Sequence, residues 1–161
     1  MSDRIREPAF EGWYGVDEDG PHLIGARCAA CGTYCFPPVS RACPNPGCSN
    51  RDDPNSEYEG QHAGKGLERV RLSRTGTLWS YTNACYQPPE PYVSANPFQP
   101  FAIAAVSLER EKMIVLGQVV QSFGVERLRV GMRMQLVLET LYSDEQSEKI
   151  VWKWRPAEEE A

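Results

Sequence analysis

Four cysteines in two close pairs are the residues of this sequence best suited to metal chemistry. Two residues separate Cys28 from Cys31, four separate Cys43 from Cys48, and eleven lie between the pairs. Each pair can form one turn of a tetrahedral all-thiolate site, in which sulfur binds zinc at about 2.3 Å. The spacing therefore predicts a zinc ion held by these four thiolates. Iron in the same ligand set, a disulfide pair or free thiols are the alternatives.

Two neighbouring residues, Cys35 and His22, are weaker candidates for the same site. Cys35 lies outside both pairs, and along an extended segment its side chain alternates with those of Tyr34 and Phe36. His22 is distant from either pair, so we expect a hydrogen-bonded histidine rather than a ligand. A four-thiolate site leaves no open position for substrate, so the expected role of the metal is structural.

Cys85 is the candidate nucleophile, because a lone thiol can act in covalent catalysis when a base lowers its pKa. The chain has only two histidines, His22 and His62, and neither is visibly placed to serve Cys85. The sequence also has no nucleophile elbow, phosphate loop, HExxH motif or dinucleotide fingerprint. We therefore expect no catalytic residue in this chain and no catalysis by the chain alone.

Two groups of residues are candidates for contact with a ligand or partner. Residues 85–100 form a long proline-rich segment, whose prolines lower the entropic cost of presenting its aromatic side chains. Residues 65–74 form a basic cluster that suits a phosphate or an acidic surface. The alternatives are a loop folded back over its own domain and a solvated strand face. The candidate contacts are Tyr86, Tyr92, Phe98, Arg69, Arg71 and Arg74.

Composition narrows the class of partner and the compartment. The 161 residues carry a formal net charge of −5 and a pI near 5.1, which disfavours a broad nucleic-acid interface. The first residues are polar, with no apolar signal segment, and no apolar run is long enough to span a membrane. Six cysteines without a signal peptide indicate metal binding in a reducing cytoplasm.

The hydrophobic pattern predicts a mainly β protein with a zinc ribbon followed by a five-stranded OB-fold barrel. The order of three strands, a short helical break at 125–131 and two strands is that of an OB-fold. The expected barrel strands are 76–84, 101–109, 113–121, 132–142 and 149–155. The expected segments are an N-terminal arm at 1–21, the ribbon at 22–50, a linker at 51–66, the barrel at 67–156 and an acidic tail at 157–161. The aromatic residues of the arm, Phe10, Trp13 and Tyr14, either pack on their own domain or dock on a partner.

Several of these motifs together resemble a known family. The first cysteine pair with Gly32, the Phe36-Pro37-Pro38 segment and the second pair resemble the rubredoxin-like zinc ribbon of OB-fold acyl-CoA-associated proteins (domain of unknown function thirty-five). The 76–82, 130–132 and 154–156 segments resemble the barrel of that family. This chain departs from the family pattern in its longer second cysteine pair and its longer linker.

The resemblance implies a function that the residues alone do not. Members of this family bind thiolase-like subunits and are required there for carbon–carbon bond chemistry on acyl-CoA thioesters. The 86–100 loop and the Trp152/Trp154 strand are most similar to the small subunit of 2-benzoylsuccinyl-CoA thiolase, which acts in anaerobic toluene degradation. The implied role is a non-catalytic, zinc-binding accessory subunit of an acyl-CoA acyltransferase complex, with CoA or acyl-CoA at the complex interface. A free-standing acyl-CoA-binding module and a single-strand nucleic-acid-binding OB protein are the alternatives.

Overall fold

The structure is a computed structural model that describes residues 4–38, 42–49, 66–90 and 92–157. The predicted linker at 51–66 and acidic tail at 157–161 lie, except for their residues 66 and 157, outside the described residues. The chain divides into two compact units, which we describe separately. The first comprises residues 1–11, 75–107 and 114–161, and the second comprises residues 12–74 and 108–113.

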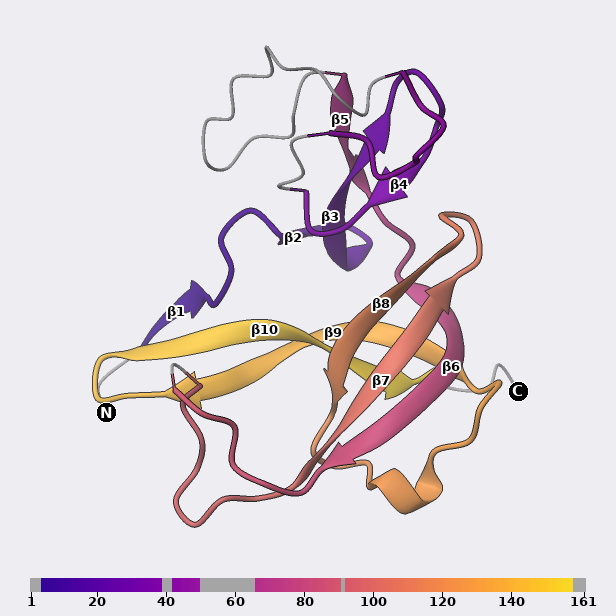
Figure 1. Cartoon of the computed structure of the whole chain (residues 1–161). Helices are drawn as coiled ribbons and strands as arrows, with labels where there is room; N and C mark the ends of the chain where they lie inside the picture. Colours follow the sequence, from indigo (N-terminus) through magenta and orange to yellow (C-terminus); the bar gives the residue numbers. More distant parts are fainter. Residues whose placement is uncertain (1–3, 39–41, 50–65, 91, 158–161) are drawn as a thin grey trace. The chain divides into compact units, whose positions relative to one another are not determined.

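The first unit is built around a closed barrel of five strands (Figure 1). They are β6 (Thr75–Ala84), β7 (Phe101–Leu108), β8 (Met113–Val119), β9 (Arg133–Ser143) and β10 (Ser147–Pro156). The strand order β10-β8-β7-β6-β9 closes because β9 also pairs with β10, and β8 and β10 run parallel. The 3₁₀ helix η1 (Val125–Arg127) lies between β8 and β9 in the chain and is the one helical element of the described ranges. The predicted OB-fold barrel is confirmed.

Strand alternation explains how the barrel fills its interior. Met134 and Leu136 on β9 are buried two residues apart, as side chains on one face of a strand must be. Leu136 pairs with Trp154 of β10, which is fully buried. A Cβ added at Gly117 would lie 2.8 Å from a carbon of the Trp154 ring, so the tryptophan occupies the space that a side chain on β8 would fill.

The N-terminal segment does not form a separate arm in the structure. β1 (Ile5–Pro8) adds to the barrel sheet by pairing in parallel with β10, and the Phe10 ring packs 5.7 Å from that of Trp152. The Trp13 ring packs 5.8 Å from that of Phe36. The structure therefore favours packing of the segment on its own chain over contact with a partner.

The second unit is a small sheet centred on β3 (Gly20–Cys28). β3 pairs antiparallel with β2 (Tyr14–Asp17), β4 (Tyr34–Cys35) and β5 (Leu67–Arg71). We expected the barrel to begin at residue 67, but β5 belongs to this second sheet and the barrel begins with β6. The physical reason is the burial of Leu67, whose side chain joins Ala26, Cys28 and Cys43 in a hydrophobic cluster of this unit.

The absence of long helices also bears on membranes. Within the described ranges, no helix has the length and apolar character that crossing a bilayer requires.

Candidate metal centre

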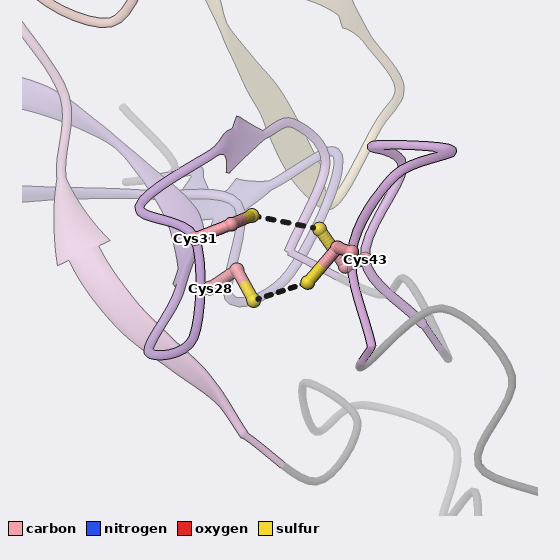
Figure 2. Close-up of side chains that lie close together, drawn as sticks. Cys28, Cys31 and Cys43 are labelled. Atoms are coloured by element: carbon pink, nitrogen blue, oxygen red, sulfur yellow. Dashed lines mark hydrogen bonds between the residues drawn. The ribbon is translucent and has the colours of Figure 1, made fainter.

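The thiols of Cys28, Cys31, Cys43 and Cys48 meet in the second unit, with their sulfur atoms all within 4.8 Å of one another. Figure 2 shows the side chains of the first pair facing those of the second. The Sγ–Sγ distance is 3.7 Å between Cys28 and Cys48 and 3.4 Å between Cys31 and Cys43. A tetrahedron with zinc–sulfur bonds of about 2.3 Å has sulfurs about 3.8 Å apart, so this spacing fits a zinc ion.

All six cysteines are free thiols in the structure, so the disulfide alternative is not formed. Cys35 lies outside the four-thiol group and packs, half-buried, against its apolar side. The four thiols brought together are therefore those that the spacing predicts. Zinc occupancy itself is proposed below.

The first turn of the site is closed by the backbone around Gly32. Cys28 ends β3, its N–H donates to the carbonyl of Thr33 (2.9 Å), and its own carbonyl accepts from the N–H of Gly32 (2.8 Å). Gly32 has a φ of 76°, a left-handed conformation that most side chains rarely adopt. A Cβ there would also lie 3.2 Å from the Arg27 guanidinium. The glycine therefore allows the turn that places Cys31 opposite the second pair.

The second turn uses a side chain in place of a strand. The Asn45 side-chain oxygen accepts from the N–H of Gly47 (3.0 Å), and the Asn45 carbonyl accepts from the N–H of Cys48 (3.1 Å). Asparagine commonly closes turns by bonding to the backbone two residues on. The two extra residues of this pair, relative to the first, are taken up by this turn.

The thiols differ in how easily they lose a proton. Hydrogen bonding to the hydroxyl and backbone of Thr33 lowers the pKa of Cys31 to about 6. Burial raises the pKa of Cys43 to about 12 and also raises that of Cys35. Metals bind thiolates, so a cation binding here displaces the proton of Cys43 and adds to the thiolate that Cys31 already supplies.

The predicted basic cluster is largely engaged within its own unit. Arg71 and Arg74 donate to the two carboxylate oxygens of Asp17, at 2.7 and 2.5 Å. The hydrogen bond from Arg74 is the largest cause that lowers the pKa of Asp17. The buried His22 places its Nδ1 3.2 Å from the same carboxylate, so it is not near the thiols as a ligand. Arg69 is exposed on β5. Contact of these arginines with a ligand or partner stays a prediction.

Asp17 is the residue of this network that sequence reasoning missed. It lies on β2, and the arginines that it binds lie more than fifty residues later in the chain, on β5 and just after it. Only the pairing of β3 with both β2 and β5 brings them together. No local pattern signals such a contact.

The aromatic loop between β6 and β7 divides between two roles. The Tyr92 ring stacks on that of Phe101 at 5.9 Å, and its hydroxyl accepts a hydrogen bond from Gln118 (3.3 Å). The Phe98 ring meets the same Phe101 ring edge-on at 6.2 Å. Tyr92 and Phe98 thus fold back onto the barrel unit, whereas Tyr86 is exposed. The remaining thiol, Cys85, is exposed and hydrogen bonds with Asn83.

An exposed apolar surface on the barrel was also missed. Trp79 on β6 and Leu116 on β8 are each 61% exposed, and Ile114 on β8 is exposed on the same side of the strand as Leu116. β6 and β8 flank β7 in the sheet. Large apolar side chains exposed together on a sheet indicate a contact surface more often than single ones do.

Comparison with known proteins agrees with this fold. Residues 69–139 match the family described as ChsH2, C-terminal OB-fold domain. The structure is similar to a solved structure titled "Ltp2-ChsH2(DUF35) aldolase", with a TM-score of 0.55 and 24% sequence identity over 84% of each chain. No curated protein matches the chain in sequence.

Proposed function

Residues 69–139 belong to the DUF35 OB-fold family represented by the C-terminal domain of ChsH2, and from this we propose that the chain is a zinc-binding accessory subunit of a thiolase-type complex. In this role the chain supplies shape and contacts to a partner that carries the catalytic residues. The family match of the OB-fold segment is the observation that carries the proposal.

Two further observations support it. The structurally similar protein is titled as an aldolase that combines Ltp2 with the DUF35 protein ChsH2, so that member works with an enzyme. The exposed apolar residues Trp79, Ile114 and Leu116 give this chain a surface of the kind that a partner subunit covers.

The metal in this proposal is a structural Zn²⁺ held by the four thiolates. Sulfur spacing near that of a zinc tetrahedron and the burial of Cys28 and Cys43 support a closed site. A closed thiolate site stabilises the small sheet around β3, which otherwise has a modest core.

The substrate in this proposal is an acyl-CoA thioester, bound at the interface with the partner. This part rests on the resemblance of the cysteine pairs and the barrel motifs to the acyl-CoA-associated family. The finer proposal, thiolysis of 2-benzoylsuccinyl-CoA, rests on the resemblance of the 86–100 loop and the Trp152/Trp154 strand alone.

Co-expression with a thiolase-type protein from the same genome tests the role. We expect the two chains to co-purify, the complex to turn over an acyl-CoA thioester, and the isolated chain to show no turnover. The partner assayed without this chain should lose most of its activity. Turnover by the isolated chain, or full activity of the partner alone, would contradict the proposal. Saturable CoA binding without complex formation would instead favour a free-standing acyl-CoA-binding module.

A further inference from the structure

The barrel unit contains a buried lysine that neither the metal centre nor the exposed apolar surface uses. The side chain of Lys153 on β10 is only 7% exposed, and lysines are seldom buried unless they are paired. Its position alternates with those of Trp152 and Trp154, so it lies on the other face of β10 from them. Its register partners are Gln118 of β8 and Val137 of β9.

The ammonium of Lys153 has donors to spare. In the described part of the chain its partner is Glu139, whose carboxylate oxygen lies 3.2 Å away and whose side chain is 40% exposed. An ammonium offers three N–H donors and attracts further acceptors wherever space is open beside it. Glu139 is on the solvent side of the pair, so the opposite side of the ammonium remains for another acceptor.

Such space exists beneath the aromatic loop. Lys153 lines a cavity of about 90 Å³ that also has polar walls from Gln118, Gln121 and Thr140. Tyr92 and Phe98 cover it from the loop. A second cavity of about 170 Å³ shares Phe101 and Gln121 with the first and is otherwise largely apolar. Both volumes exceed the roughly 10–15 Å³ that one water molecule needs.

The two cavities differ in chemistry in a way that selects a class of ligand. One end offers a cation and amide groups, and the other offers apolar and aromatic walls. We propose that these cavities bind a small organic carboxylate, with its carboxylate beside Lys153 and its aryl or short alkyl group against Phe101. A cationic ligand would be repelled by the ammonium, and a neutral amide would forgo the charge-assisted hydrogen bond. The proposal does not depend on the proposed accessory function.

The first test compares two ligands of the same shape on the full-length chain. Isothermal titration calorimetry with benzoate and with benzamide isolates the charge, since the two differ chiefly at the carboxylate. We expect saturable binding of benzoate at millimolar concentration, at least about tenfold tighter than that of benzamide. Equal affinities, or no binding of benzoate, would overturn the proposal, since water alone would then fill the cavities.

Two substitutions with opposite expected effects locate the site. Lys153→Met keeps the length of the side chain and removes its charge, so benzoate affinity should fall at least about tenfold. Glu139→Gln removes the competing carboxylate, so benzoate should bind more tightly than to the unaltered chain. A purely structural role of the ion pair would weaken binding in both variants.

Lys112→Met is the matched control, because Lys112 is an exposed lysine outside these cavities and outside the barrel unit. It should leave benzoate affinity unchanged. Equal loss in the Lys112 and Lys153 variants would show a nonspecific charge effect and overturn the assignment. If Lys153→Met does not fold, the Glu139→Gln variant and the benzoate–benzamide comparison decide the question.

Discussion

At the scale of single residues, the six cysteines show how neighbours set the role of one side-chain type. Four converge within 4.8 Å, Cys35 is half-buried beside them, and Cys85 is exposed on the other unit. Position within a turn separates ligands from bystanders, because only paired cysteines in tight turns can direct two sulfurs at one point.

Replacing one thiol at a time tests this division. Cys43→Ser removes a buried thiolate from the proposed tetrahedron and should abolish stoichiometric zinc binding. The loss of affinity should exceed the roughly 10–100-fold that removal of a supporting outer group costs. Cys35→Ser, the matched control, should retain one zinc per chain. Elemental analysis and titration with a chromogenic chelator measure both, and zinc loss in the Cys35 variant would contradict the ligand set.

At the scale of elements, the barrel depends on the absence of a side chain where β8 faces β10. A methyl group at Gly117 would lie 2.8 and 2.9 Å from atoms of the Trp154 ring and 3.1 Å from a carbon of Trp152. Trp154 is fully buried and closely packed, so neither ring can move away without disturbing the barrel core.

Gly117→Ala should therefore destabilise the barrel unit by about 1–3 kcal/mol, as overpacking of a core does. Urea denaturation followed by tryptophan fluorescence measures the free energy of unfolding. Trp154→Phe removes the ring atoms that clash, so the double variant should be more stable than the sum of the two single effects. Strict additivity would show that the glycine is not required by the tryptophan.

The elements themselves were largely predictable, because their signals are local. Alternation of apolar residues and breaks at glycine and proline placed the five barrel strands to within about two residues at their ends. The cysteine spacing likewise identified the four converging thiols. β5 was assigned to the wrong sheet, because alternation shows that a segment is extended but not which strand it will pair with.

Long-range contacts account for what the sequence did not reveal. The ion pairs of Asp17, the cavities beside Lys153 and the packing of Tyr92 on Phe101 all join residues from different strands or loops. Loop aromatics that looked free to meet a partner instead cover the barrel, with Tyr86 left exposed. The exposed Trp79 was read only as a residue of a strand.

At the scale of the whole molecule, the chain combines an acidic net charge with apolar side chains left uncovered on its barrel. Net charge of −5 keeps copies of the chain apart, whereas an apolar surface favours association with a partner. Trp79 and Leu116 are candidates for the central contacts of such a surface, because large apolar side chains, tryptophan above all, contribute strongly at interfaces. Both are 61% exposed, so replacing either removes little buried surface from the barrel itself.

Trp79→Ser and Leu116→Ser should each weaken binding of the thiolase-type partner at least about tenfold, while leaving the melting temperature of the isolated chain nearly unchanged. Val130→Ser is the matched control, because Val130 is 68% exposed on the same unit but lies outside strands β6 and β8. Surface plasmon resonance against the partner measures affinity, and differential scanning calorimetry measures stability. Unchanged affinity in the first two variants, or an equal loss in the Val130 variant, would move the contact surface elsewhere on the chain. A parallel loss of stability and affinity would mean that these side chains support the barrel rather than the complex.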